Sequence, residues 1–279
     1  MSVKPFYSQE TVVESHLELV KLPVDRMQWG AEDWQFADLY MPDEPSPYQK
    51  DEGVPCVMLI HGGFWRKKFT LDLMAPIAED LAEQGIAAWN IEFKGWGPED
   101  EGVWMDTLSD VMRAWGQLAL LPGIDIVRSM ILGHSAGGHL ALMMSAVAER
   151  KPWLTIAQAP IADIVAADHA KLSDDGDAVR RWMGCAPEGN EEMWRRVNPV
   201  DNPPKTSVML MHGKADQDVP WIQSESYARA MKAKGVEIQK IWLPGDHYSI
   251  IDVASDDWLA QVEAIKDWLE GSIPCAAWH

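Results

Sequence analysis

The chain has 279 residues, of which 47% are apolar and 24% charged, which is ordinary for a globular protein with one substantial core. Its 43 acidic residues outnumber 24 basic ones, and the formal net charge of −19 repels phosphate backbones and anionic lipids. Nucleic acid and membranes are therefore not expected as partners.

The cysteines and the N-terminal residues indicate the cellular compartment in which the protein works. Cys56, Cys185 and Cys275 lack paired spacing, and no Cys/His cluster offers a zinc site, so we expect free thiols and no metal. The first residues lack the apolar stretch of a signal peptide, and no run of 18 apolar residues occurs. We expect a cytoplasmic protein.

Hydrophobic patterning predicts the elements in chain order. Residues 16–22 and 35–40 alternate apolar and polar side chains, as half-buried antiparallel edge strands do. Short continuous apolar runs then predict strands covered on both faces, at 56–60, 86–91, 130–132, 154–157 and 208–211. Segments of helical period lie between them, at 71–84, 105–121 and 224–234. This alternation predicts a mostly parallel sheet wrapped by helices.

Residues 161–203 break that rhythm. The interval is rich in Asp, Ala, Trp and Pro and is too long for a strand-to-helix loop. We expect a lid-like insertion within a single domain spanning 1–279, with an ordinary surface excursion as the alternative.

A candidate nucleophile follows the strand at 130–132. Gly133-His134-Ser135-Ala136-Gly137 fits Gly-x-Ser-x-Gly, in which a sharp strand-to-helix turn exposes the serine hydroxyl and the glycines make room for it. A serine hydroxyl needs a base, so an acid and then a histidine should follow in the chain.

Both residues appear after later strands. The run at 208–211 leads into a loop carrying Asp216 and Asp218, and the run at 236–243 leads to His247. The carboxyl ends of parallel strands share one edge, so Ser135, Asp216 and His247 can converge. Asp216 is favoured over Asp218 because it is nearer the strand end, and Asp246 is interpreted as a turn-stabilising residue.

The loop His61-Gly62-Gly63-Phe64-Trp65 is a source of hydrogen-bond donors for an oxyanion. We expect the backbone N–H groups of Gly63, Phe64 and Ala136 to form the oxyanion hole. Three other histidines are interpreted as scaffold rather than as bases, namely His61, His134 and His139.

Aromatic residues flank several predicted strand ends. We expect the substrate pocket to be lined by Trp65, Trp96, Trp104 and Tyr248, with simple packing as the alternative for Trp96 and Trp104. Glu92 is an unusual charge at a strand end, and we expect it to pair with an arginine or a backbone amide.

These motifs, together with Asn90-Ile91-Glu92-Phe93 and His212-Gly213-x-x-Asp216, resemble the α/β-hydrolases over residues 55–270. The oxyanion loop and His247-Tyr248-Ser249 are similar to the esterase/lipase branch that includes kynurenine formamidases. The resemblance implies an eight-stranded, mostly parallel sheet, the triad Ser135, Asp216 and His247, and no cofactor. Two departures concern the pocket: Phe93-Lys94 replaces the Tyr-Arg of many relatives, and Phe64 replaces a third glycine.

The leading hypothesis is a serine hydrolase that cleaves a small carboxylic ester through an acyl-enzyme. The alternatives are an arylformamidase acting on an N-formylkynurenine-type formamide and a non-catalytic ligand receptor. A peptidase of the prolyl-oligopeptidase kind is disfavoured because no propeller accompanies the hydrolase. We expect a small-molecule ester or amide as partner, and a homodimer is compatible with the sequence.

Overall fold

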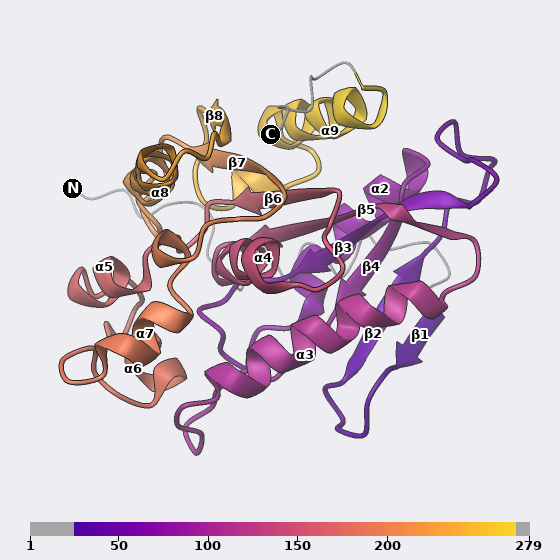
Figure 1. Cartoon of the computed structure of the whole chain (residues 1–279). Coiled ribbons are helices and arrows are strands. Elements are labelled where there is room, and N and C mark those ends of the chain that lie inside the picture. The colour runs from indigo at the N-terminus through magenta and orange to yellow at the C-terminus, as the bar shows by residue number, and fades with distance from the viewer. Residues whose placement is uncertain (1–24, 272–279) are drawn as a thin grey trace.

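One eight-stranded sheet organises the chain, and the computed structural model describes it over residues 25–271 (Figure 1). The strand order is β1-β2-β4-β3-β5-β6-β7-β8. Strands β3 to β8 pair in parallel, whereas β1 pairs with β2 and β2 with β4 in antiparallel fashion. The strands are β1 (Asp25–Gln28), β2 (Phe36–Tyr40), β3 (Val54–Ile60), β4 (Ala87–Ile91), β5 (Ile124–His134), β6 (Leu154–Gln158), β7 (Ser207–Gly213) and β8 (Gln239–Leu243).

Helices occupy most of the connections between strands. They are α2 (Ala75–Glu83), α3 (Trp104–Gln117), α4 (Ala136–Val147), α5 (Ile164–His169), α6 (Ala178–Met183), α7 (Glu191–Arg196), α8 (Ile222–Ala233) and α9 (Asp256–Leu269). Short 3₁₀ turns are η1 (Leu71–Met74), η2 (Leu118–Leu120), η3 (Pro199–Asp201) and η4 (Ser249–Ile251). The result is an α/β-hydrolase fold with a mostly parallel sheet, as the motifs predict.

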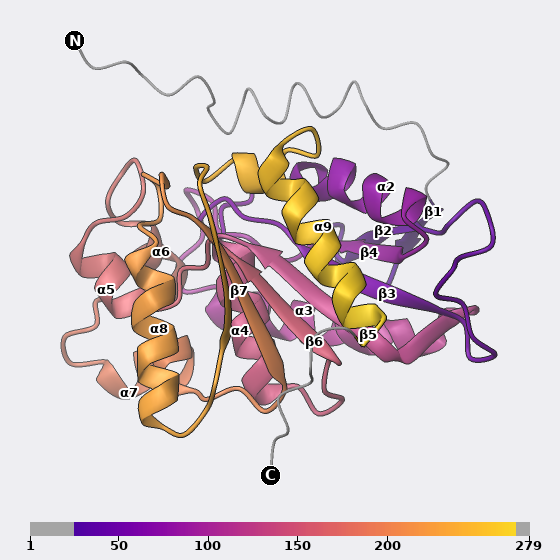
Figure 2. The same ribbon diagram turned by 90° about the horizontal axis from the view of Figure 1, so that it is seen from above.

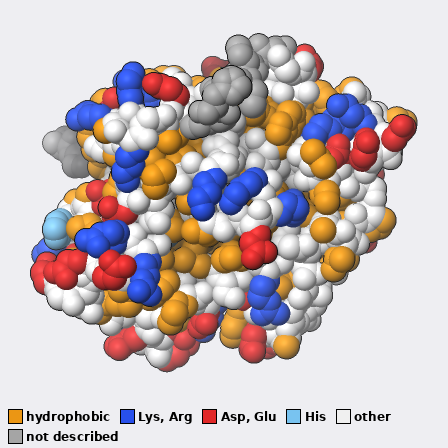
Figure 3. All heavy atoms as spheres, viewed as in Figure 1, with side chains coloured by type: hydrophobic (Ala, Val, Ile, Leu, Met, Phe, Trp, Pro, Cys, Tyr) orange, Lys and Arg blue, Asp and Glu red, His pale blue; other side chains and the backbone are white. Residues whose placement is uncertain are grey.

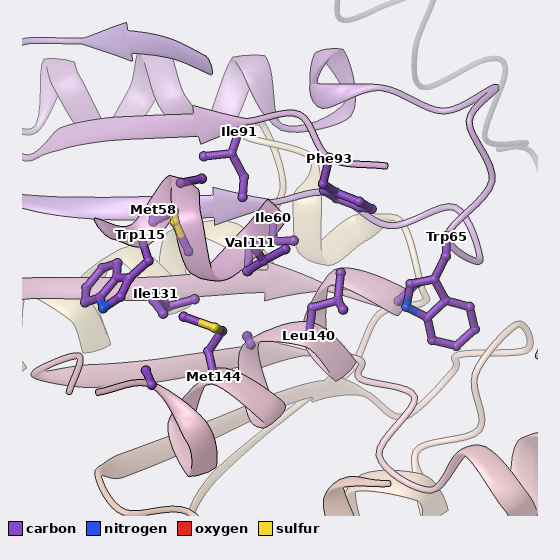
Figure 4. Packing of buried hydrophobic residues seen from close by; sticks show 14 of the residues in the cluster. Met58, Ile60, Trp65, Ile91, Phe93, Val111, Trp115, Ile131, Leu140 and Met144 are labelled. Carbon is purple, nitrogen blue, oxygen red and sulfur yellow. The ribbon is translucent and has the colours of Figure 1, made fainter. Parts of the chain in front are cut away.

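The central strands are apolar throughout because both faces of the sheet are covered. Along β3, Met58 and Ile60 join a cluster with α3 and α4, whereas Val57 and Leu59 join a cluster with α2 and α9. A third cluster packs α8 against β6 and β7. Figure 4 shows the first cluster, in which Met58, Ile60 and Ile131 of the strands face Leu140 and Met144 of α4.

Most predicted elements are confirmed within the described residues. The five apolar runs lie in β3, β4, β5, β6 and β7, and the helical segment at 105–121 lies over α3 and η2. The segment at 71–84 is divided into η1 and α2 near Pro76, which has no backbone N–H to donate. The segment at 224–234 corresponds to α8.

The prediction for the antiparallel part is confirmed only for β2. That strand is antiparallel, but it is not an edge strand, since β1 pairs along its outer side. Strand β1 was not predicted, because Asp25, Arg26, Met27 and Gln28 are all exposed and show no apolar face. The run at 16–22 lies outside the described residues.

The interval 161–203 forms α5, α6, α7 and η3 between β6 and β7 (Figure 2). Its tryptophans Trp182 and Trp194 are fully buried in the same cluster as α3 and α4. The indole N–H of Trp182 donates to Thr107 Oγ1 at 3.1 Å. The outer surface of these helices carries interspersed acidic and basic side chains (Figure 3). The insertion is therefore anchored in the core and polar on its outside.

A search of residues 25–271 for a helix long and apolar enough to cross a bilayer finds none.

Helix α9 offers a test of how the core stabilises the fold. Trp258 is fully buried, and its indole N–H donates to Asp80 Oδ2 of α2 at 2.8 Å. We expect Trp258→Ala to lower the free energy of unfolding by about 3–5 kcal/mol, because it leaves a cavity and removes a hydrogen bond between two helices. Urea denaturation measures this change. The control is Leu259→Ala at an exposed position of the same helix, and equal losses in both variants would contradict the packing argument.

Candidate active site

Ser135 lies at a strained turn between β5 and α4. Its backbone has φ of 57° and ψ of −117°, a conformation that L-residues rarely adopt. Hydrogen bonds hold the turn on both sides: Ser135 N–H donates to Gln158 O at 2.8 Å, and Ser135 O accepts from His139 N–H at 3.0 Å. The side chain is fully buried, and Oγ has no hydrogen-bond partner among the described residues.

Glycines allow three backbone segments to meet at this turn. A Cβ added at Gly137 would lie 2.1 Å from Ile60 O, so α4 starts directly against the end of β3. A Cβ at Gly133 would lie 2.1 Å from Gly137 O. A Cβ at Gly62 would lie 3.0 Å from Ser135 Cβ, which places the loop after β3 beside the serine.

Asp216 and His247 form a buried, charge-assisted pair beyond β7 and β8. His247 Nδ1 lies 2.6 Å from Asp216 Oδ2. This contact requires Nδ1 to carry the proton, so Nε2 of neutral His247 is left as a proton acceptor. Nε2 is buried and has no hydrogen-bond partner among the described residues. Asp218, the competing carboxylate, instead accepts from the Tyr248 hydroxyl at 3.4 Å.

The Asp216 carboxylate is held by more than His247. Its Oδ1 accepts the backbone N–H groups of Asp218 and Val219 at 2.9 and 2.8 Å. His212 Nε2 lies 3.2 Å from Oδ2, a contact that the sequence argument did not predict. Burial by itself raises the pKa of Asp216, but the charge of His247 and the hydrogen bonds from both histidines outweigh it and hold the pKa well below its usual range. Asp216 is therefore a permanent anion.

That anion also sets the protonation behaviour of His247. Burial lowers the pKa of the imidazole, whereas the charge of Asp216 and the hydrogen bond to it raise the pKa, and the net shift is upward from 6.5. The His247 ring lies 4.6 Å, centre to centre, from the ring of His134, the residue before Ser135. His134 Nε2 in turn lies 2.9 Å from His247 O. The elbow and the histidine loop are thus joined directly.

The loop after β3 has an unusual backbone conformation over three consecutive residues. Gly63, Phe64 and Trp65 all have positive φ, at 100°, 52° and 56°. The Trp96 indole N–H donates to Phe64 O at 2.9 Å, which fixes the orientation of that peptide. Ala136 begins α4, and helix geometry leaves its N–H without an intrahelical acceptor.

Glu92 stabilises the loop after β3. Its carboxylate accepts the backbone N–H groups of Leu71 and Phe93, both at 3.0 Å, as the sequence argument expected. The side-chain partner is a histidine rather than an arginine, because His61 Nε2 lies 2.9 Å from Glu92 Oε1. The His61 ring also stacks on Phe93 at 4.3 Å. His61 is thus braced within the scaffold.

The remaining histidine and turn residues also make structural contacts. His139 Nε2 lies 2.8 Å from Val197 O, and burial lowers the pKa of this imidazole to about 4, so His139 is neutral. Burial likewise holds the pKa of His134 well below its ordinary value. Asp246 Oδ1 accepts the N–H groups of Tyr248 and Ser249, which stabilises the turn that carries His247.

The four predicted pocket aromatics lie in different surroundings. Trp96 lines a surface hollow beside the loop after β3. Tyr248 packs edge-on against His247 at 5.3 Å. Trp65 is fully buried and stacks on Trp182 of the insertion at 4.4 Å, and Trp104 packs partly buried against the core. Contact of these residues with a substrate stays a prediction.

Residues 91–273 match the model of the prolyl oligopeptidase family, and this match decides the family of the chain. The chain belongs to this family. It is therefore a serine hydrolase of the α/β-hydrolase superfamily. The sequence argument disfavoured a peptidase of this kind because no propeller accompanies the hydrolase, but the match covers the helices and strands from α3 to α9. Family membership thus rests on the residues of the hydrolase fold and does not require a propeller.

Individual relatives are distant. The chain is 26% identical over 262 residues to the acylamino-acid-releasing enzyme of Rattus norvegicus, covering 84% of the chain but 35% of that protein. It thus spans about a third of the length of the first curated relatives that it matches. It is 23% identical over 275 residues to the kynurenine formamidase of Danio rerio, covering 91% of the chain and 87% of that protein.

Solved structures agree on the fold. Esterase B from Lactobacillus rhamnosis superposes with a TM-score of 0.74 at 17% identity and 94% coverage of both chains. Esterase Est2 from Thermogutta terrifontis superposes with a TM-score of 0.69 at 20% identity, covering 91% of this chain and 94% of that chain.

The Asp216–His247 contact leads to a prediction about the pKa of His247. In Asp216→Asn, burial is no longer opposed by the carboxylate, so we expect the pKa of His247 to fall below its value in the unmodified protein. NMR titration of the imidazole measures this shift. Asp218→Asn is the matched control, since it removes a nearby charge without touching Nδ1, and we expect a smaller fall. Equal falls in the two variants would mean that the hydrogen bond does not set the pKa.

Proposed function

We propose that this serine hydrolase cleaves small carboxylic esters through an acyl-enzyme on Ser135. The observation that carries the proposal is the 2.6 Å contact between His247 and Asp216 beside the strained Ser135 turn. Ser135 Oγ and His247 Nε2 are both buried without hydrogen-bond partners among the described residues, so no other group competes for the hydroxyl or for the base.

In the proposed reaction, His247 Nε2 takes the proton of the Ser135 hydroxyl as Oγ attacks the ester carbonyl carbon. The imidazolium then gives this proton to the leaving alkoxide as the ester C–O bond breaks. Water then gives a proton to the same Nε2 as its oxygen attacks the acyl carbon. The bond from that carbon to Ser135 Oγ breaks, Oγ takes the proton back from the imidazolium, and the acid is released. Asp216 holds the Nδ1 proton throughout and stabilises the imidazolium.

The oxyanion is assigned to the N–H groups of Gly63, Phe64 and Ala136. Donors fixed before the reaction need no reorganisation, and each is worth about 3 kcal/mol of transition-state stabilisation. The Trp96 indole and Glu92 support this role, because they hold the loop that carries two of the donors, the former through Phe64 O and the latter through His61. We expect the enzyme to work in the cytoplasm without a cofactor.

An arylformamidase is the second candidate. The specific observation in its favour is that the kynurenine formamidase of Danio rerio is matched over 87% of its length, whereas the acylamino-acid-releasing enzyme of Rattus norvegicus is matched over 35%. The chemistry would use the same residues, with an amine as the leaving group. A formyl group needs almost no space beside Ser135, whereas longer esters need a channel.

Hydrolysis of p-nitrophenyl acetate, butyrate and octanoate, compared with N-formylkynurenine, separates the two candidates. We expect the acetate and butyrate to have the highest kcat/KM, and the octanoate the lowest among the esters, because Ser135 is closely covered. A preference for N-formylkynurenine over every ester would replace the proposal by the arylformamidase.

The nucleophile is tested by labelling with a fluorophosphonate probe. We expect the protein to be labelled and Ser135→Ala to lose both labelling and ester hydrolysis, with a fall in kcat of about 10⁴-fold or more. Ser145→Ala is the matched control on the same helix, because its hydroxyl donates to Leu142 O and lies away from the turn. Labelling that persists in Ser135→Ala would assign the nucleophile elsewhere.

A further inference from the structure

A hollow of about 390 Å³ adjoins the loop that carries the oxyanion donors. Its walls come from the loop after β3, the loop after β4 and the insertion. Figure 1 shows the loop that precedes α3 beside α6, where Gly102 N–H donates to Arg181 O. The lining residues are Arg66, Lys67, Lys68, Trp96, Gly97, Pro98, Asp174, Asp175 and Arg181. Two lysines and two arginines thus face two aspartates, in a protein where acidic residues dominate.

Arg66 is the fixed cation of this hollow. Its backbone N–H donates to Gly63 O at 3.0 Å, so the residue belongs to the turn of the oxyanion loop. Its side chain is only 7% exposed, and its guanidinium lies 5.7 Å from the Phe64 ring centre and 5.5 Å from that of Trp96. The aromatic rings hold the planar guanidinium in place before anything binds.

The partners of Arg66 are, by contrast, at the surface. Its guanidinium lies 3.0 Å from Asp175 and 3.5 Å from Asp174, whose side chains are 68% and 86% exposed. Neighbouring Ser173 has φ of 122°, a strained value for a residue other than glycine. The exposed segment that carries Asp174 and Asp175 is therefore held by ion pairs to a buried arginine, and its backbone conformation at Ser173 is unfavourable.

We propose that this hollow binds a carboxylate group of the substrate, and that Arg66 selects for it by exchanging Asp174 and Asp175 for the substrate anion. The inference rests on the proposed function and narrows it to esters that carry a carboxylate. A guanidinium binds two carboxylate oxygens in its own plane, so a substrate carboxylate reproduces the contact that the aspartates make. An aromatic ring on the substrate would pack on Trp96, which also has the Arg181 guanidinium 5.3 Å from its ring centre.

The exchange also bears on access to the nucleophile, because Asp174 lies close enough to Asp218 and Tyr248, beside His247, for its charge to act on both. Ser135 is fully buried, so a substrate enters only if part of the covering structure moves. A neutral ester must separate Arg66 from its two aspartates without replacing them. An anionic ester replaces them as it binds, and it therefore recovers the electrostatic energy that opening costs.

The test compares two acetyl esters that differ in charge, the acetate of 4-hydroxybenzoate and the acetate of methyl 4-hydroxybenzoate. The measured quantity is the ratio of kcat/KM for the anionic ester to that for the neutral one. Different leaving-group reactivities cancel when this ratio is compared between variants. We expect Arg66→Gln to lower the ratio by roughly ten-fold, since it removes a charged hydrogen-bond donor to the anion.

The aspartates provide the discriminating variant. In the double variant Asp174→Asn with Asp175→Asn, Arg66 has no competing anion, so we expect the ratio to rise. If the ion pairs served only to hold the insertion, removing either side would change the ratio in the same direction. Shifts of the same sign in both variants, or no shift in either, would overturn the proposal.

Arg66→Lys keeps the charge but loses the planar fork. Its kcat/KM ratio should lie between those of Arg66→Gln and the unmodified enzyme, and it replaces the glutamine variant if that variant fails to fold.

Arg113→Gln is the control for loss of a positive charge, since Arg113 stacks on Trp29 and lines a different hollow, and we expect an unchanged ratio.

Calorimetric titration of Ser135→Ala with benzoate, and with benzamide as its neutral counterpart, tests the hollow independently of catalysis. Benzoate binding that is lost in Ser135→Ala combined with Arg66→Gln supports the anion site even if no ester proves to be a substrate. Equal binding of benzoate and benzamide would overturn the site while leaving the ester proposal intact.

Discussion

The close approach of helix α4 to the end of β3 is the constraint on which the rest of the site depends. Gly137 has no side chain, and an added Cβ would lie 2.1 Å from Ile60 O. The contact sets the start of α4, and with it the positions of Ser135 and of the Ala136 N–H. The same contact holds the loop after β3 beside the serine. The proposed nucleophile and the proposed oxyanion donors thus come from one packing arrangement of backbone atoms, and their relative positions do not depend on flexible side chains.

Charge in the site is organised around a single buried anion. Asp216 has two backbone N–H donors and two histidine partners, so its negative charge is balanced by hydrogen bonds in a place that excludes water. Other buried histidines connect loops, with His134 joined to the histidine turn and His61 to Glu92. Burial lowers the pKa of His134, whereas Asp216 raises the pKa of the adjacent His247, so the two neighbouring imidazoles do not carry like charges together.

The sequence alone predicts the parts of this protein that depend on local pattern. Apolar runs with turn signals locate the parallel strands, and Gly133 and Gly137 mark the elbow, because these features need few residues and no distant partner. Side-chain direction is not local, so the spacing of Asp216 and Asp218 could not separate them, and the contact with His212 was missed. Strand β1 was missed because an exposed strand carries no hydrophobic signal. Arg66 shows the same limit, since its partner Asp175 is 109 residues away in the chain.

The stacking of Trp182 on Trp65 bears on how fast the site opens. With Trp182 and Trp194 fixed in the core, the helices of the insertion cannot swing away without exposing a large apolar area. Movement that leaves these tryptophans packed is then restricted to short connections such as the segment between α5 (Ile164–His169) and α6 (Ala178–Met183). Loops of this size rearrange within nanoseconds to microseconds, whereas most enzymes turn over about 1 to 10³ times per second. If the exchange proposed at Arg66 opens the site through this segment alone, opening equilibrates many times in each catalytic cycle and does not limit turnover.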